Sequence, residues 1–138
     1  MKTARRTSVT LLAAVALTAL TACSGEPDDG NDVPSGWIRQ QYASTNEAGY
    51  VDDSDPAPRV AQEIDGHTAA QAQFKDGDKV FLRYRDDIVA ITPRPSAGSR
   101  IEIADYRTGY HRWRSHIGSV WPDPDSDSFR GGGPGSGK

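Results

Sequence analysis

Apolar and polar positions alternate most clearly between residues 80 and 104 of this chain. Three β-rich runs, residues 80–85, 88–92 and 100–104, are enriched in branched and aromatic side chains. Asp86 and Asp87 separate the first run from the second, while Pro93 and a Pro-Ser-Ala-Gly-Ser loop separate the second from the third. Because both connections are short, the pattern predicts a three-stranded antiparallel meander.

Two short helices are predicted before the meander. Ser35 can cap a helix over residues 37–42, and a second helix over residues 58–64 is expected to stop at Gly66. Their apolar sides comprise Trp37, Ile38 and Tyr42 in the first and Val60, Ala61 and Ile64 in the second. Residues 44–58 otherwise indicate an irregular or extended connection, and residues 67–78 receive no assignment.

A third helix is favoured after the meander. Asp105 can cap it, and Tyr106, Tyr110 and Trp113 recur at i, i+4 and i+7. Gly109 and the aromatic content leave a fourth strand open as the alternative. Residues beyond it that are expected to pack on the core are Ile117, Val120 and Trp121. The predicted fold is therefore a small α+β domain in which short helices cover the meander.

The first residues predict export. Positive charges near the start precede an apolar run over residues 9–20, which is shorter than the roughly 20 residues of a membrane-spanning helix. The run ends in Leu20-Thr21-Ala22-Cys23, which resembles a bacterial lipobox. That resemblance implies cleavage before Cys23 and a diacylglyceryl anchor, with acyl chains such as palmitate. The alternative is a secretory signal without lipid.

These features divide the chain into four parts. Residues 1–22 form the signal peptide, 23–35 a lipidated cysteine and disordered tether, 36–122 the α+β domain, and 123–138 an acidic, then Gly-rich, flexible tail. Removal of the signal takes three of 16 basic residues and none of 19 acidic ones, so the formal net charge falls from −3 to −6. The expected location is the extracytoplasmic face of the cell membrane.

Candidate binding residues concentrate in one basic-aromatic stretch. They are Arg107, Tyr110, Arg112, Trp113 and Arg114. Guanidinium groups suit carboxylate and phosphate, so the partner is expected to be an anionic lipid, a wall polymer or a membrane protein. The alternative is that the acidic front of the chain, residues 24–60, neutralises the basic half, residues 79–121, internally. The net negative charge argues against nucleic acid.

Two apparent motifs lack residues that their chemistry requires. The terminal Gly132–Lys138 stretch matches G-x-x-x-x-G-K, but no helix or hydroxyl follows the lysine, so no nucleotide is expected. Asp123, Asp125 and Asp127 resemble the start of a calcium loop that lacks its Gly and Glu. No cofactor, metal site or catalytic residue is predicted, and the protein is expected not to be an enzyme. A cell-wall hydrolase or transferase using His111 or His116 is the alternative.

Four strings together resemble a known family. They are Gly36-Trp37-Ile38-Arg39, Val80-Phe81-Leu82-Arg83-Tyr84-Arg85, Gly109-Tyr110-His111-Arg112-Trp113-Arg114 and the terminal FRGGGPGSGK. The chain resembles an uncharacterised family of small actinobacterial lipoproteins, a domain of unknown function. The resemblance implies an exported, membrane-tethered protein and carries no catalytic residue. We expect a non-enzymatic binding or assembly module; a structural subunit whose tail docks a membrane partner is a further possibility.

Overall fold

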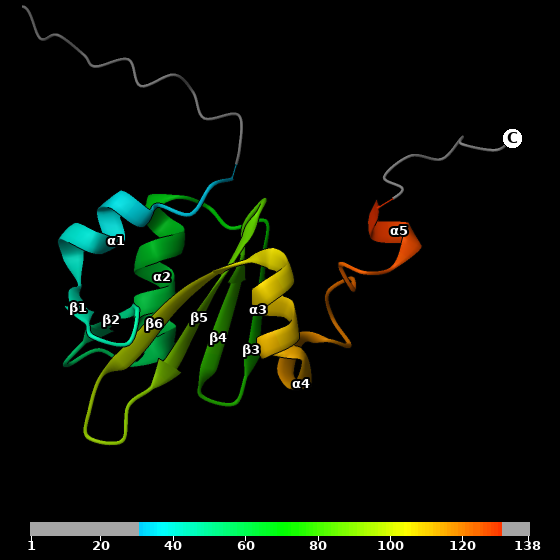
Figure 1. The fold of residues 1–138 in the computed structure, drawn as a ribbon. Coiled ribbons are helices and arrows are strands. Elements are labelled where there is room, and N and C mark those ends of the chain that lie inside the picture. Colours follow the sequence, from blue (N-terminus) through cyan, green and yellow to red (C-terminus); the bar gives the residue numbers. More distant parts are fainter. Residues whose placement is uncertain (1–30, 131–138) are drawn as a thin grey trace, which may run out of the picture.

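The computed structural model describes residues 31–130 (Figure 1). It is a mixed α+β fold around a six-stranded antiparallel sheet with the order β1-β2-β6-β5-β4-β3. The strands are β1 (Ala43–Thr45), β2 (Gly49–Asp52), β3 (Ala72–Asp76), β4 (Lys79–Arg83), β5 (Asp87–Pro93) and β6 (Ser99–Asp105). The predicted meander is present as β4, β5 and β6, but the sheet is twice as wide.

The three missed strands lie at the two sides of the meander. Strand β3 comes from the unassigned residues 67–78 and pairs with β4 along its whole length. Strands β1 and β2 form a hairpin inside the stretch expected to be irregular, and β2 pairs with β6. These strands are three to five residues long and carry few apolar residues. Their strand character therefore depends on pairing with neighbours and not on a local pattern.

Helices α1 (Ser35–Gln41) and α2 (Ala57–His67) cover one face of the sheet (Figure 1). Their buried residues pack against side chains of the strands in a mainly aliphatic cluster, which comprises Ile38, Tyr42, Ala57, Val60, Ala61, Ile64, Val80, Leu82, Tyr84, Val89, Ile91 and Ile101. Two predicted ends were wrong. Pro34 and not Ser35 precedes the first turn of α1, and Gly66 lies inside α2, which continues to His67 before the extended Thr68.

Helices α3 (Tyr106–Arg112) and α4 (Arg114–Ile117) cover part of the other face. The helical prediction is thus confirmed, and the Asp105 carboxylate caps α3 by accepting a hydrogen bond from the Thr108 amide at 3.0 Å. The second cluster is mainly aromatic and comprises Phe81, Ile88, Ala90, Tyr106, Tyr110, Trp113, Ile117 and Trp121. Val120 was expected in this core, but its side chain is 48% exposed.

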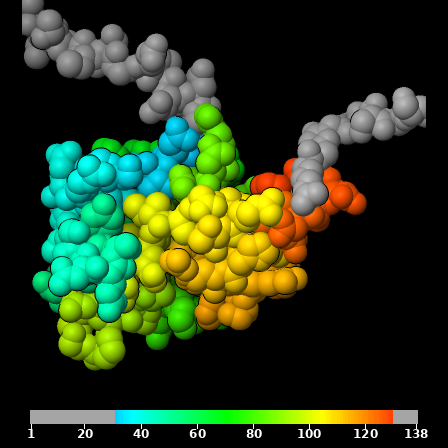
Figure 2. Space-filling model, viewed as in Figure 1, coloured from blue at the N-terminus to red at the C-terminus, as the bar shows by residue number. Residues whose placement is uncertain are grey.

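Residues 122–130 lie beside α3 and α4, with the short helix α5 (Asp127–Arg130) among them (Figure 2). Because this stretch is acidic and contains two prolines, the sequence predicts that a flexible tail starts here. In the structure the Tyr106 hydroxyl donates to the Pro122 carbonyl oxygen at 2.8 Å. The rings of Tyr106 and Phe129 also stack, with centroids 5.1 Å apart. These contacts fold the stretch back onto the domain.

Candidate functional site

Two stripes of side chains, offset by one residue, run along α3 and α4. The first stripe is aromatic and comprises Tyr106, Tyr110 and Trp113, which are 5%, 2% and 7% exposed. The second, here called the basic stripe, comprises Arg107, His111 and Arg114, which follow the aromatic residues one position later. Residues four and seven positions apart share one side of a helix, so burying one stripe turns the other to the surface.

Burial changes the role expected for the two predicted aromatic site residues. Tyr110 and Trp113 lie in the second core cluster, packed with Phe81 and Ile88 from the sheet. The Tyr110 hydroxyl donates to the Gly118 carbonyl oxygen at 3.3 Å. Because both rings are buried, they hold α3 on the sheet and are not placed to touch a partner. The basic-aromatic stretch is therefore divided into a buried aromatic side and an exposed basic side.

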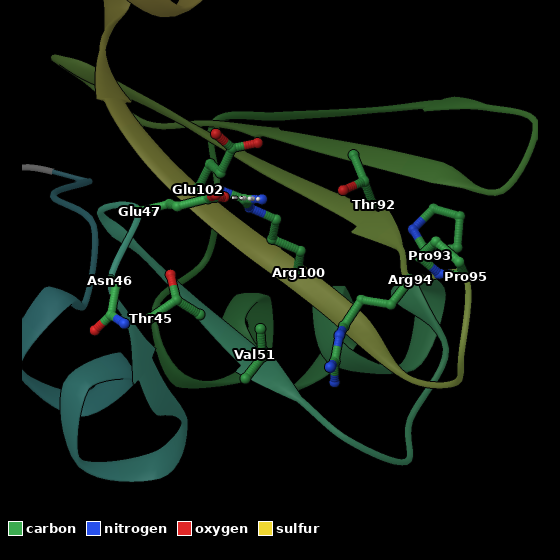
Figure 3. Close-up of a pocket in the computed structure, with 10 residues that line it drawn as sticks. All are labelled: Thr45, Asn46, Glu47, Val51, Thr92, Pro93, Arg94, Pro95, Arg100 and Glu102. Carbon is green, nitrogen blue, oxygen red and sulfur yellow. Dashed lines mark ion pairs between the residues drawn. The ribbon is translucent and has the colours of Figure 1, made fainter.

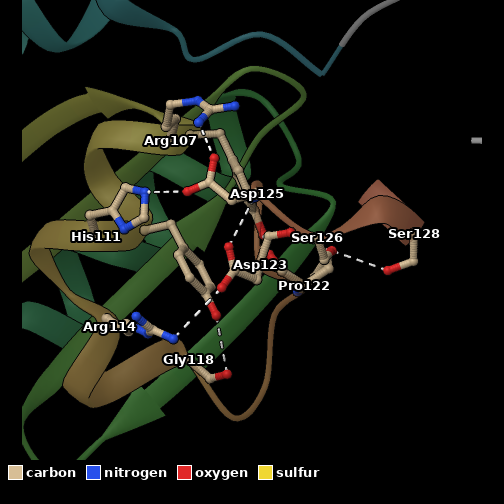
Figure 4. Close-up of polar contacts among 11 residues, drawn as sticks. Arg107, His111, Arg114, Gly118, Pro122, Asp123, Asp125, Ser126 and Ser128 are labelled. Carbon is tan, nitrogen blue, oxygen red and sulfur yellow. Dashed lines mark hydrogen bonds and ion pairs between the residues drawn. The ribbon is translucent and has the colours of Figure 1, made fainter. Parts of the chain in front are cut away.

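The basic stripe faces the acidic residues that follow Trp121 (Figure 4). Asp125 pairs with the Arg107 guanidinium and lies 2.9 Å from the His111 Nε2 atom. Asp123 pairs with Arg114 at 3.7 Å. The side chains of Arg107 and Arg114 are 56% and 64% exposed, and those of Asp123 and Asp125 are 32% and 40% exposed. Ion pairs of such exposed groups contribute about 0–1 kcal/mol each.

Arg112 points to a different neighbour. Its guanidinium lies 3.6 Å from the Glu102 carboxylate of β6 and over the Trp113 ring, 5.6 Å from its centroid. Glu102 lies on the same face of the sheet, because it is paired with Ala90 in the register of β5 and β6. The three predicted arginines therefore lie on the same face of the sheet, but only Arg107 and Arg114 contact the acidic residues after Trp121, while Arg112 contacts β6.

Two carboxylates near the start of α3 have shifted pKa values in opposite directions. Hydrogen bonds from the Thr108 side chain and backbone lower the pKa of the capping Asp105. Burial raises the pKa of Asp87, and the nearby charges of Asp86 and Asp105 add to that rise. Asp87 and Asp105 are opposite each other in the β5–β6 register. Burial also raises the pKa of Tyr106, while the adjacent Arg83 opposes that rise.

Residues 16–138 match the family described as Domain of unknown function (DUF4247). The chain belongs to this family. No curated protein and no solved structure gives a significant match. The DUF4247 match confirms the expectation of an uncharacterised family but supplies no activity, so functional inference must come from the arrangement of side chains. The expected actinobacterial lipoprotein origin stays a prediction.

A polar hollow lies on the half of this face that α3 and α4 leave open (Figure 3). Its volume is about 650 Å³, and strands β1, β2, β5 and β6 contribute to its lining. Arg100 pairs with Glu47 at 3.0 Å, and Arg94 pairs with Asp53 beside the hollow. Here residues of the acidic front do neutralise arginines of the basic half, as the internal alternative expects. The arginines of α3 and α4 use Glu102, Asp123 and Asp125 instead.

The histidines that the hydrolase alternative would use lie in surface ion pairs. The His116 Nδ1 atom is 2.6 Å from an Asp76 carboxylate oxygen, and the His116 ring stacks on Phe81. His111 pairs with Asp125 as described above, and neither histidine lines the polar hollow. Among residues 31–130, no three His, Cys, Asp or Glu side chains are grouped so that they could hold a metal ion.

The proposed anchor lies outside the described residues. The predicted lipid site lies before residue 31, at Cys23 and the lipobox residues Leu20, Thr21 and Ala22. Lipidation and membrane location therefore stay predictions. The Gly-rich residues 131–138 also lie outside the described range, so their flexibility stays a prediction too. Between residues 31 and 130, no helix is both long and apolar enough to cross a membrane.

Sequence reasoning missed three members of this site. His111 was considered only as a possible metal ligand or catalytic group, although it shares the i, i+4, i+7 spacing of Arg107 and Arg114. Asp123 and Asp125 were assigned to a solvated linker. The signal that could have found them is the match between two carboxylates spaced two residues apart and a basic stripe just upstream.

Proposed function

We propose that this protein is a membrane-anchored extracytoplasmic binding or assembly module that takes an anionic partner on α3 and α4. The observation that supports this function is the exposure of Arg107, Arg112 and Arg114 on the face of the sheet that α3 and α4 cover. More than half of each side chain is exposed, at 56%, 51% and 64%. Guanidinium groups presented in this way donate paired hydrogen bonds to carboxylate or phosphate.

The packing beneath these arginines supports a preformed surface. The aromatic stripe fixes α3 against the sheet, and the Asp105 cap fixes its first turn. A rigid backbone lowers the entropy lost when long side chains bind a partner. The internal counter-ions do not exclude binding, because exposed ion pairs are weak enough for an external anion to replace them.

Membrane anchoring supports the location of the partner. Two acyl chains on Cys23 would hold the protein durably at the membrane, since one chain alone binds only marginally. Asn31 already accepts a hydrogen bond from the Arg85 amide and Val33 packs on the first cluster, so at most residues 24–30 separate Cys23 from the described domain. A flexible tether of that length would reach roughly 15 Å. The partner should then lie close to the membrane surface. We propose binding in preference to wall hydrolysis because neither candidate histidine lines the polar hollow.

Capture of the lipidated protein from gently solubilised membranes tests this proposal. We expect a specific protein to co-purify at low salt and to be lost at high salt, because screening shortens to about 8 Å at physiological ionic strength. The triple variant Arg107→Ala, Arg112→Ala and Arg114→Ala should lose it. The matched triple variant Arg39→Ala, Arg59→Ala and Arg85→Ala removes three arginines that are exposed outside α3 and α4, and it should keep the captured protein.

Two results would contradict the proposal. One is a co-purifying protein that both triple variants retain equally, which would place the binding surface elsewhere. The other is no co-purifying protein at any salt concentration together with no arginine-dependent binding to vesicles of anionic phospholipid or to isolated wall polymer.

A further inference from the structure

Residues 122–129, here called the acidic segment, lie on the basic stripe in the manner of a bound peptide. The two carboxylates of Asp123 and Asp125 meet the stripe, as Figure 4 shows. The backbone also takes part, because the Tyr106 hydroxyl donates to the Pro122 carbonyl oxygen at 2.8 Å. Pro124, between the two aspartates, is buried.

The acidic segment is organised internally. The Asp125 amide donates to the Asp123 carboxylate at 2.9 Å, and the Ser126 hydroxyl donates to the Asp123 carbonyl oxygen at 2.6 Å. This turn presents the Asp123 carboxylate to Arg114 and the Asp125 carboxylate to Arg107 and His111. The spacing of the basic stripe therefore matches two acidic residues that flank a proline.

The hold on the acidic segment is weak enough to be reversed. Its ion pairs join part-exposed groups, each contributing about 0–1 kcal/mol. Phe129, which stacks on Tyr106, is itself 39% exposed. Trp121, just before the segment, is 6% exposed and belongs to the core. Trp121 can therefore stay in the core when the segment leaves the stripe, and departure uncovers the buried Pro124 and the Tyr106 ring at the edge of the cluster.

We infer that the basic stripe recognises an acidic peptide segment of the Asp-Pro-Asp type on a partner protein, and that residues 122–129 are its competitor within the same chain. This inference rests on the proposed function and specifies its partner. A peptide fits better than a lipid headgroup. A phosphate would satisfy Arg107 and Arg114, but it offers no peptide carbonyl for Tyr106 and no proline for the buried position of Pro124.

Competition within one chain predicts a distinctive response to mutation. A short tether gives the internal segment an effective concentration in the millimolar range. Wild-type protein should therefore bind an added peptide weakly. Replacement of Asp123 and Asp125 by asparagine removes the competing charges while keeping side chains of similar shape. This variant should therefore bind the same peptide more tightly.

The experiment uses the full chain and a labelled synthetic peptide with the sequence of residues 121–130. Fluorescence anisotropy at low salt should show about tenfold tighter binding to the Asp123→Asn, Asp125→Asn variant than to wild type, since roughly 1.4 kcal/mol of competing ion pairing is lost. Asp127→Asn, in the same segment but outside the ion pairs described above, should bind like wild type. A peptide with Asn in place of Asp123 and Asp125 should not bind.

Equal peptide affinity for wild type and the double variant would overturn the inference, as would peptide binding that survives Arg107→Ala and Arg114→Ala. Circular dichroism on each variant separates lost binding from lost folding. If the double variant does not bind the peptide but still captures a membrane protein through its arginines, the inference fails and the proposed function stands. Arginine-dependent binding to anionic vesicles without peptide binding assigns the surface to lipid. Both proposals are rejected if peptide binding, an arginine-dependent captured protein, and arginine-dependent binding to anionic vesicles or wall polymer are all absent.

Discussion

The two faces of the sheet are covered by helices of different character. Helices α1 and α2 lie on a mainly aliphatic cluster that also contains Tyr42 and Tyr84, whereas α3 and α4 lie on a mainly aromatic one and leave a polar hollow uncovered. On the second face, the helix that buries its rings also exposes a basic stripe with acidic counterparts. The comparison suggests that the first face serves mainly folding, while the second combines folding with presentation of charge.

The largest expected effect on stability comes from removing the ring that holds α3 against the second face of the sheet. Trp113 is 7% exposed and packs with Phe81, so Trp113→Ala should lower the free energy of unfolding by about 3–5 kcal/mol. Trp37, only partly buried and stacked on His67 at 4.8 Å, offers a matched tryptophan on the first face. Its replacement by Ala should cost less, about 0.5–3 kcal/mol, because its ring is only partly buried. Urea denaturation measures both, and equal losses would refute the contrast.

Two helical glycines, one on each face of the sheet, test how tightly α2 and α3 pack on that sheet. A Cβ atom at Gly109 in α3 would lie 2.8 Å from the Trp113 ring and 3.1 Å from the Ile88 Cβ atom. Gly109→Ala should therefore destabilise the protein by about 1–3 kcal/mol. Gly66 in α2 has open space around it, so Gly66→Ala should stabilise by about 0.5–1 kcal/mol. Thermal unfolding reports the signs, and the same sign in both variants would contradict the packing described for α3.

The facing carboxylates Asp87 and Asp105 give a pH test at the entry to α3. The lowered pKa of Asp105 means that its stabilising charge is fully present above the unfolded pKa, roughly 3.9, and is lost as pH falls through the folded pKa. Asp105→Ala should cost about 1 kcal/mol at pH 7. Asp87→Asn should stabilise at pH 7, because burial penalises its charge, and this gain should disappear in acid. Urea titrations across pH that show parallel behaviour would contradict these assignments.

The smallest expected effect on stability lies at the surface of α3 and α4. Arg107→Ala and Arg114→Ala together should change the free energy of unfolding by no more than about 1 kcal/mol per ion pair. The same substitutions should weaken binding to the anionic partner. Combined denaturation and binding measurements separate the two roles, and a large loss of stability would assign these arginines to folding.

The sequence predicted the elements whose side chains follow a regular pattern. Strands β4, β5 and β6 alternate clearly, and the aromatic spacing of Tyr106, Tyr110 and Trp113 correctly indicated a helix with one buried side. Strands β1 and β2 could not be predicted, since pairing with β6 and not local composition makes them strands.

The site was predicted only in part for a related reason. Sequence located the arginines of α3 and α4, but it treated the adjacent rings as contact residues because burial depends on the sheet beneath them. It also assigned Asp123 and Asp125 to solvent, because their pairing with the basic stripe requires the chain to turn back after Trp121. Long-range contacts of this kind leave no local periodicity.

The most direct test compares the two halves of the second face as binding surfaces. The partner captured at low salt should be offered to the Arg107→Ala, Arg112→Ala, Arg114→Ala variant and to an Arg94→Ala, Arg100→Ala variant at the polar hollow. We predict that binding is lost in the first variant and retained in the second. Loss at the hollow with retention on α3 and α4 would contradict the central claim that the exposed arginines of these helices take an anionic partner.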